Sequence, residues 1–208
     1  MEFEIVSFDL QGTLSDGAFS DEFWLETLPF LYAQKETIPL EKARNILKKQ
    51  FKEFGKYDSR YYSLQYWLKE LKIDFNFDQI MKLMKNKPHF FEDGKKLLKE
   101  LNGKTNLIII SSTTKEFIDV EMQGNEKYFS QIFSSLDQFN IPGKPKEVYQ
   151  KIAQKLGVQN NKILHIGDSK EMDIDNAKKA GFHTFYFDNT LQRPVVIKQL
   201  REFLFASR

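Results

Sequence analysis

The apolar residues of this chain follow two different rhythms. From about Gly17 to about Lys87 they recur at spacings of three and four, which is typical of amphipathic helices. The clearest stripe comprises Leu40, Ala43, Leu47, Phe51 and Phe54. Pro39 near its start and Gly55 just past its end are typical helix boundaries, and Pro88 stops the last stripe. No strand-like alternation appears in this stretch, so it predicts an all-helical unit.

On either side of this unit, short continuous apolar runs predict strands that are buried on both faces of a parallel sheet. The runs are residues 3–8, 107–110, 163–166 and 184–187, with a weaker one at 129–134 where a helix is an alternative. Helical patterns separate them at 94–101, 145–156, 174–180 and 195–205, and a capping box at 113–116 predicts one more helix start. This alternation predicts an α/β fold with a doubly wound parallel sheet and right-handed crossovers. We expect a core domain of residues 1–16 and 88–208 and an inserted helical domain of residues 17–87.

Composition narrows the class of protein. The 208 residues are 41% hydrophobic and 29% charged, as in a soluble globular protein. Lys and Arg number 31 against 29 Asp and Glu, which argues against a partner that is nucleic acid or an anionic membrane. The absence of cysteine excludes disulfides, thiolate catalysis and Cys-based zinc sites. The first strand begins within two residues of Met1 and no apolar run approaches the ~18 residues that span a bilayer, so we expect a cytoplasmic protein.

Polar side chains stand where the predicted strands end. Asp9 follows the first strand, and a carboxylate at that edge of an open α/β sheet is a candidate nucleophile. Ser111 follows the second strand, and Lys144 lies between Gly143 and Pro145 at the start of a helix. Asp168 ends a later strand, with Asp173 five residues beyond it.

These four segments, taken in order, resemble the four motifs of the haloacid dehalogenase superfamily. Its phosphatases carry Asp-x-Asp-Gly-Thr-Leu, and this chain has Asp9-Leu10-Gln11-Gly12-Thr13-Leu14. The helical insert resembles the cap of that family. The resemblance implies a Rossmann-like core and a Mg²⁺-dependent hydrolase that acts on a small phosphorylated metabolite through an aspartyl-phosphate intermediate, as a monomer or a homodimer.

The same residue types suit phosphate-ester hydrolysis on physical grounds. The reaction needs an in-line nucleophile and positive charge against the phosphoryl oxygens. Mg²⁺ can bind a carboxylate and a phosphate together, with Asp9 and Asp168 as its protein ligands. The resemblance adds the backbone carbonyl of Gln11 as a third ligand. Lys144 would neutralise the phosphate and screen Asp9 from Asp168, and Asp173 would orient Lys144, complete the outer shell of the metal, or serve only as a helix N-terminal charge.

The residues that would bind the phosphoryl group are less sharply defined. Ser111 offers a hydroxyl donor, but the adjacent Ser112 leaves the assignment open by one position. Thr13 is either part of the phosphate-binding turn or a turn residue that supports it. Lys144 would complete the group.

Gln11 is the departure from the pattern, because it stands where those phosphatases keep a second aspartate. An amide cannot donate or take a proton, and general acid–base catalysis contributes ~10²–10⁴ in rate. We therefore expect slow turnover of phosphate monoesters. Gln11 could still orient a water molecule, and Asp16 or Asp21 could replace the missing carboxylate.

Three other functions are compatible with these residues. A 2-haloacid dehalogenase also uses an aspartate nucleophile without the second aspartate, but needs no metal. A phosphonate-cleaving hydrolase requires a cap lysine that forms a Schiff base. A non-catalytic protein that binds a phosphorylated metabolite would retain the site without turnover.

Overall fold

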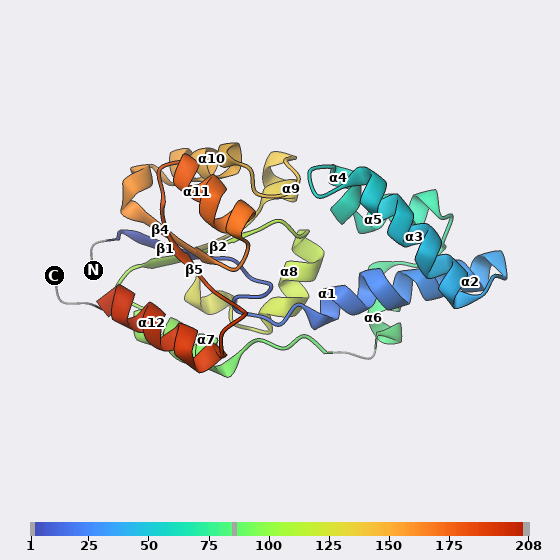
Figure 1. Ribbon diagram of the computed structural model, residues 1–208, viewed down its shortest axis with the longest axis horizontal. Helices are drawn as coiled ribbons and strands as arrows, with labels where there is room; N and C mark the ends of the chain where they lie inside the picture. Colours follow the sequence, from blue (N-terminus) through green and yellow to red (C-terminus); the bar gives the residue numbers. More distant parts are fainter. Residues whose placement is uncertain (1–2, 85–86, 206–208) are drawn as a thin grey trace.

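The core of the protein is a five-stranded parallel sheet (Figure 1). The computed structural model describes residues 3–84 and 87–205, so residues 1–2 and 206–208 of the predicted core domain and residues 85–86 of the predicted helical domain lie outside it. The strands are β1 (Ile5–Phe8), β2 (Asn106–Ser111), β3 (Gln131–Ser134), β4 (Ile163–Gly167) and β5 (His183–Tyr186). Their order is β3-β2-β1-β4-β5. The chain winds outward from β1 in both directions, which confirms the predicted doubly wound fold and places the topological switch point between β1 and β4.

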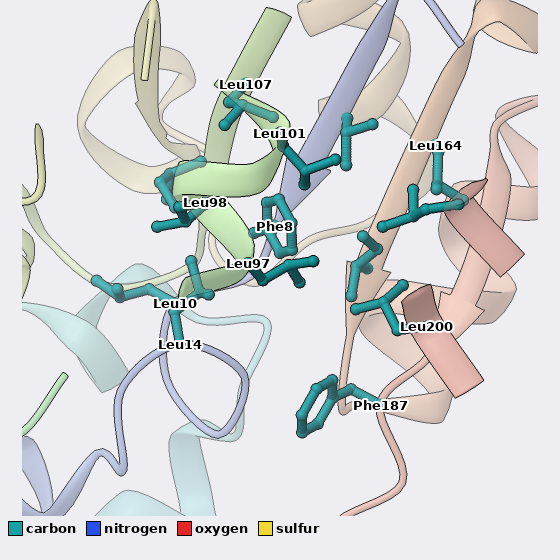
Figure 2. Packing of buried hydrophobic residues seen from close by; sticks show 14 of the residues in the cluster. Phe8, Leu10, Leu14, Leu97, Leu98, Leu101, Leu107, Leu164, Phe187 and Leu200 are labelled. Atoms are coloured by element: carbon teal, nitrogen blue, oxygen red, sulfur yellow. The ribbon is translucent and has the colours of Figure 1, made fainter. Parts of the chain in front are cut away.

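Helices cover both faces of the sheet because successive strand residues point to opposite sides. Val6 and Phe8 pack on one side, against α7 (Glu92–Leu101) and α12 (Arg193–Phe205); Figure 2 shows this cluster around Phe8. Ile5 packs on the other side against α10 (Lys146–Leu156) and α11 (Asn176–Lys179). The central strands β1 and β4 are therefore buried along their whole length, as the sequence predicted for a sheet covered on both faces.

The remaining core elements adjust the predicted boundaries. They are α8 (Lys115–Met122), α9 (Ser135–Phe139), two 3₁₀ turns (Glu126–Tyr128 and Asn160–Lys162) and the π-helical turn η4 (Lys170–Asp175). The capping box predicted at 113–116 is wrong: Thr114 is the N-cap of α8 but its hydroxyl caps nothing. Asp137 of α9 instead accepts from the backbone N–H of Lys115, because the two helices begin side by side above neighbouring strands.

Residues 17–84 are helical between their turns, and this part of the described chain contains no strand. The elements are α1 (Ala18–Glu22), the π-helical turn η1 (Phe23–Thr27), α2 (Leu28–Glu36), α3 (Leu40–Phe54), α4 (Ser59–Tyr62), α5 (Leu64–Glu70) and α6 (Phe77–Leu83). They lie beyond the carboxyl ends of the strands (Figure 1). Their aromatic cluster, which includes Phe23 and Trp67, also takes in Phe117 of α8. Over the described residues, every helix is too short or too polar to cross a bilayer.

The two connections between the helical segment and the sheet run side by side. Ser15 forms isolated backbone bridges with Gln11 on one side and Phe90 on the other. The N–H of Phe91 donates to the carbonyl of Leu14 at 2.8 Å. The outgoing and returning chains are thus joined to each other at the point where both leave the core.

Candidate active site

Asp9 directly follows β1, at the edge of the sheet where the carboxyl ends of the strands lie. Its backbone N–H donates to the carbonyl of Ile166 at 2.8 Å, which extends the pairing of β1 with β4 by one residue. The residue is 7% exposed. The Nζ atom of Lys144 lies 2.7 Å from Asp9 Oδ1, and no donor in the described chain reaches Oδ2. Burial is the main cause that raises the pKa of Asp9, and the charges of Asp173 and Asp168 add to it, against the opposing effect of Lys144.

The turn after Asp9 brings the chain against Asp168. Gly12 has a φ of +79°, a left-handed conformation that glycine adopts without steric cost. A Cβ atom at this position would lie 2.3 Å from Oδ2 of Asp168, so no larger residue fits unless Asp168 moves. Asn189 joins the two segments by donating to the Gly12 carbonyl at 2.9 Å and to Asp168 Oδ2 at 3.1 Å.

Lys144 joins two acidic residues. Pro145 is the N-cap of α10, so Lys144 is held where that helix begins, with 1% of its surface exposed. Its ammonium pairs with Asp9 and with Asp173. Burial alone would lower the pKa of Lys144, but the charges of Asp173 and Asp9 outweigh it and raise the pKa, so the side chain stays protonated.

Asp173 is tied into the protein on both carboxylate oxygens. Oδ1 contacts Lys144 and lies 3.1 Å from Nε2 of His165, and Oδ2 accepts from the backbone N–H of Ser169 at 2.9 Å. The other ring nitrogen of His165 lies 2.7 Å from the hydroxyl of Ser7. Although burial opposes it, Lys144 and His165 lower the pKa of Asp173. His165 is thus a buried residue with partners on both nitrogens, and its contact with Asp173 explains why a histidine stands in β4.

Asp9, Asp168 and Asp173 each offer a carboxylate oxygen, and these atoms lie within 4.8 Å of one another. Among the described residues, Lys144 is the basic residue whose ammonium contacts this cluster. One ammonium against three carboxyl groups leaves an excess of negative charge. Because the oxygens of Asp173 already have protein partners, the carboxylates with capacity left for a cation are Asp9 and Asp168. Oxygen ligands of this number and charge fit a hard cation such as Mg²⁺.

The predicted phosphoryl-binding hydroxyls fall into three environments. Ser111 is 2% exposed and its Oγ accepts from the backbone N–H of Thr113 at 3.2 Å. Ser112 is partly exposed and lines a cavity. The hydroxyl of Thr13 is buried with no partner among the described residues, while its carbonyl accepts from Arg193 at 2.8 Å. Ser112 is therefore the one of the three that opens onto solvent-filled space.

The side chain of Gln11 is held by residues that the sequence analysis did not single out. Its Nε2 donates to Glu121 Oε1 at 2.7 Å and to Ser20 Oγ at 2.6 Å. Glu121 belongs to α8 and is 1% exposed. A signal for it existed, because Glu121 stands one turn after Phe117 and Ile118, on the apolar face of its helix.

A cavity of about 240 Å³ opens between the sheet edge and the helical segment. It is lined by Gln11, Ser20, Asp21, Trp24, Leu25, Phe51, Tyr61, Tyr62, Ser112 and Thr113. Of the two carboxylates considered as replacements for the missing aspartate, Asp21 lines this cavity, and burial followed by the charge of Asp16 raises its pKa. Asp16 instead accepts from the N–H of Ala18 at 3.0 Å and faces His89.

The helical segment also touches the core beside η4. Lys56 forms an ion pair with Glu171, and the hydroxyl of Tyr57 donates to the same carboxylate at 2.6 Å. Arg60 pairs with Asp58 and its guanidinium lies 4.0 Å from the centre of the Phe54 ring. Lys56 and Arg60 therefore have acidic partners already.

Comparison with known proteins gives one consistent family. A family model described as haloacid dehalogenase-like hydrolase matches residues 6–187. The chain is 22% identical over 183 residues to the GMP/IMP nucleotidase YrfG of Escherichia coli, covering 86% of this chain and 80% of that protein.

Solved structures agree with this match. A phosphatase of the same superfamily from Thermococcus onnurineus superposes with a TM-score of 0.81 at 20% identity, over 99% of both chains. The hydrolase YfnB from Bacillus subtilis, solved bound to magnesium, superposes with a TM-score of 0.62 at 17% identity, over 93% of this chain and 92% of that one.

Proposed function

Since the chain belongs to the family of haloacid dehalogenase-like hydrolases, we propose that it is a Mg²⁺-dependent phosphatase that uses Asp9 as its nucleophile. The observation that carries the proposal is the arrangement of Asp9, which has one oxygen on the Lys144 ammonium and lies beside the carboxylates of Asp168 and Asp173. The substrate is a small phosphorylated metabolite, and we place the reaction in the cytoplasm, which suits a chain without cysteine.

The metal ligands in this proposal are the carboxylates of Asp9 and Asp168 and the backbone carbonyl of Gln11. The excess of negative charge around Lys144 supports this choice, because a phosphate dianion would otherwise be repelled. When bound, Mg²⁺ supplies positive charge to the phosphoryl oxygens and brings them to Asp9. Asp173 holds the ammonium of Lys144 in position through their ion pair.

The reaction then takes two steps. A carboxylate oxygen of Asp9 attacks phosphorus, the bond from phosphorus to the ester oxygen breaks, and that oxygen takes the bonding electron pair and a proton from water to leave as the alcohol. Water next attacks the same phosphorus, the bond from phosphorus to the Asp9 oxygen breaks, and a proton of the water goes to solvent, which gives inorganic phosphate and the free Asp9 carboxylate. Lys144 and Ser112, with the turn N–H groups after Asp9, bind the phosphoryl oxygens through both steps. Ser111 stabilises the turn that carries Ser112, because its hydroxyl oxygen accepts from the backbone N–H of Thr113.

Gln11 makes both proton transfers depend on solvent. It holds no proton for the leaving oxygen and cannot take one from the attacking water, so the leaving oxygen is protonated by water. Substrates whose leaving group needs no proton, such as acyl phosphates, are therefore turned over fastest. The expected loss against a carboxylate at this position is ~10²–10⁴ in rate.

Residues 17–87 form the cap in this proposal, and residues 1–16 and 88–208 form the core. The cavity of about 240 Å³ between them is the place for the body of the substrate. Trp24, Phe51 and Tyr61 offer it flat apolar surfaces. Together with the similarity to a GMP/IMP nucleotidase, these rings favour nucleoside monophosphates as the first substrates to assay.

The rival functions are disfavoured by particular contacts. A metal-free dehalogenase has no use for the clustered carboxylates of Asp9, Asp168 and Asp173. Lys56, the cap lysine with an ion pair to the core, is engaged with Glu171 and is thus not poised as a Schiff-base lysine. A binding protein without turnover would not need Asp9 to be kept with a free oxygen.

The deciding experiment measures phosphate release from acetyl phosphate, from GMP and from p-nitrophenyl phosphate, with and without Mg²⁺. A haloacid substrate is assayed in parallel for halide release. We expect Mg²⁺-dependent phosphate release that Asp9→Asn abolishes. Metal-independent halide release would replace the proposal with a dehalogenase, and tight binding of GMP without turnover would replace it with a binding protein.

A further inference from the structure

The reaction proposed above leaves a buried carboxylate without a role. Glu121 of α8 is 1% exposed and contacts Ser20 of α1; Figure 1 shows these two helices next to each other. Its Oε1 accepts from Gln11 Nε2 at 2.7 Å and from the hydroxyl of Ser20 at 2.6 Å. Its Oε2 accepts from the hydroxyl of Ser15 at 2.9 Å. Burial raises the pKa of Glu121, and the three hydrogen bonds oppose this.

This contact fixes which way the amide of Gln11 faces. The Nε2 atom of Gln11 lies within hydrogen-bonding distance of both Glu121 Oε1 and Ser20 Oγ. The NH₂ end of Gln11 donates to these two oxygens, which can accept its hydrogen bonds. The carbonyl oxygen Oε1 of Gln11 accepts no hydrogen bond from the described part of the protein.

The free oxygen belongs to a residue of the cavity wall. Gln11 lines the cavity of about 240 Å³ together with Ser112, the proposed phosphoryl-binding hydroxyl. It also lies in the same turn as Asp9, two residues along the chain. An acceptor held rigidly at this place can hold one hydrogen of a water molecule and direct its lone pair toward the phosphoryl group.

We propose that Glu121 is a positioning residue, which holds Gln11 so that its Oε1 accepts a hydrogen bond from the water that hydrolyses the phosphorylated Asp9. The inference rests on the proposed function. It gives Gln11 a part in the second step alone, because the first step needs an acid and an amide is none. Glu121 therefore governs how fast phosphate leaves Asp9 and not how fast Asp9 is phosphorylated.

The experiment separates the two steps. Asp9 is phosphorylated with acetyl phosphate and Mg²⁺, the donor is removed by rapid desalting, and intact-mass measurements follow the formation and decay of the phosphorylated protein. Glu121→Met removes the acceptor with little change in volume. We expect its phosphorylated form to decay ~10-fold or more slowly, since displacing a catalytic contact by about 1 Å can cost this much, while the phosphorylation rate stays within about twofold.

Two further variants make the result specific. Ser15→Ala removes a hydrogen bond from the same carboxylate but from Oε2, which does not touch Gln11, so decay should stay near the natural rate. Ser20→Ala removes the second acceptor for Gln11 Nε2 and should slow decay in the same direction as Glu121→Met. It keeps the test available if Glu121→Met does not fold.

The outcomes distinguish this inference from the proposed function. Slow decay in Glu121→Met and Ser20→Ala, but not in Ser15→Ala, supports the inference. Decay that ignores Glu121, or an equal fall in both steps in all three variants, overturns it and leaves the phosphatase proposal in place. A natural protein that forms no phosphorylated Asp9 overturns the phosphatase proposal, and this inference falls with it.

Discussion

The Nζ atom of Lys144 lies 2.7 Å from Oδ1 of Asp9, and both side chains are almost entirely enclosed. The same ammonium pairs with Asp173, so one buried positive charge serves two carboxylates. Removing it leaves both without compensation. Loss of one partner of this buried ion pair should therefore lower the stability of the fold as well as the activity.

Lys144→Met should destabilise the fold by about 3–5 kcal/mol, because removing one partner strands a buried charge. Urea unfolding at neutral pH measures this, and phosphorylation of Asp9 should be lost in parallel. Lys146→Met is the control, since Lys146 is exposed on the first turn of α10. Equal stability of the two variants would contradict the buried network.

Asp173 should make stability depend on pH in acid. Its folded-state pKa lies below the ordinary value of 3.8, so its contribution is complete above pH 3.8 and is lost as the pH falls below that value. Asp173→Asn should lower the free energy of unfolding at pH 7 by about 2–4 kcal/mol and flatten its decline in acid. Unfolding curves across a pH series measure both effects. Asp175→Asn, at an exposed position in the same turn, should leave the curve unchanged.

Binding of Mg²⁺ should release protons. The pKa values of Asp9 and Asp168 are raised, in both cases chiefly by burial, and the metal binds their ionised forms. The affinity for Mg²⁺ should therefore rise with pH until these carboxylates are fully ionised, by up to about tenfold per pH unit for each proton released. Calorimetric titration in two buffers of different ionisation enthalpy counts the protons. Affinity that is independent of pH between 5 and 8 would argue against these ligands.

Gly12→Ala should weaken the metal site. The new Cβ would lie 2.3 Å from Oδ2 of Asp168, whereas a Cβ at Gly17 would find Gln11 Cβ as its nearest neighbour at 3.7 Å. The φ angles are similar, +79° and +71°, so both variants carry a backbone cost of about 1 kcal/mol. A comparison of the two variants therefore isolates the effect of the close approach between residue 12 and Asp168. We expect Mg²⁺ affinity to fall at least about tenfold in Gly12→Ala alone, which a calorimetric titration measures.

An isosteric exchange of Gln11 and Glu121 should accelerate the phosphatase. In the double variant Gln11→Glu, Glu121→Gln, the amide and the carboxylate change places, and the hydroxyls of Ser15 and Ser20 can rotate to keep their bonds. The carboxylate would then face the cavity, where acid–base catalysis is worth ~10²–10⁴ in rate. Gln11→Glu alone would set two carboxylates against each other and should be the least stable of the set. Steady-state rates and melting temperatures of all four proteins complete the cycle, and a double variant slower than the natural protein would refute it.

The fold was accessible from the sequence because its determinants are local. The runs that became β1, β2 and β4 are short and mostly apolar, which favours strands buried on both faces, and the stripe from Leu40 to Phe54 has the spacing of a helix with one apolar face. Their boundaries are less local. A helix does begin within 113–116, but the capping box expected there does not form, and Asp137, from another element, accepts from the backbone N–H of Lys115 instead.

The site shows the same division. Asp9, Lys144, Asp168 and Asp173 stand at strand ends or helix starts, so the topology alone brings them together. Glu121 and Asn189 act through contacts across more than a hundred residues, which no spacing in the sequence reveals. Glu121 could have been noticed as a charge on an apolar face, but its partner could not have been named.

The paired bridges at Ser15 bear on how the cap can move. Backbone bonds join this residue to Gln11 and to Phe90 at once, so the two connections behave as a single short ribbon. Such a ribbon permits a swing and resists a slide, because sliding would shear bonds on both sides of it. The hydroxyl of Ser15 also donates a hydrogen bond to Glu121. The pivot of that swing is therefore in direct contact with the carboxylate that holds Gln11. The axis of such a swing would then lie beside the wall of the cavity.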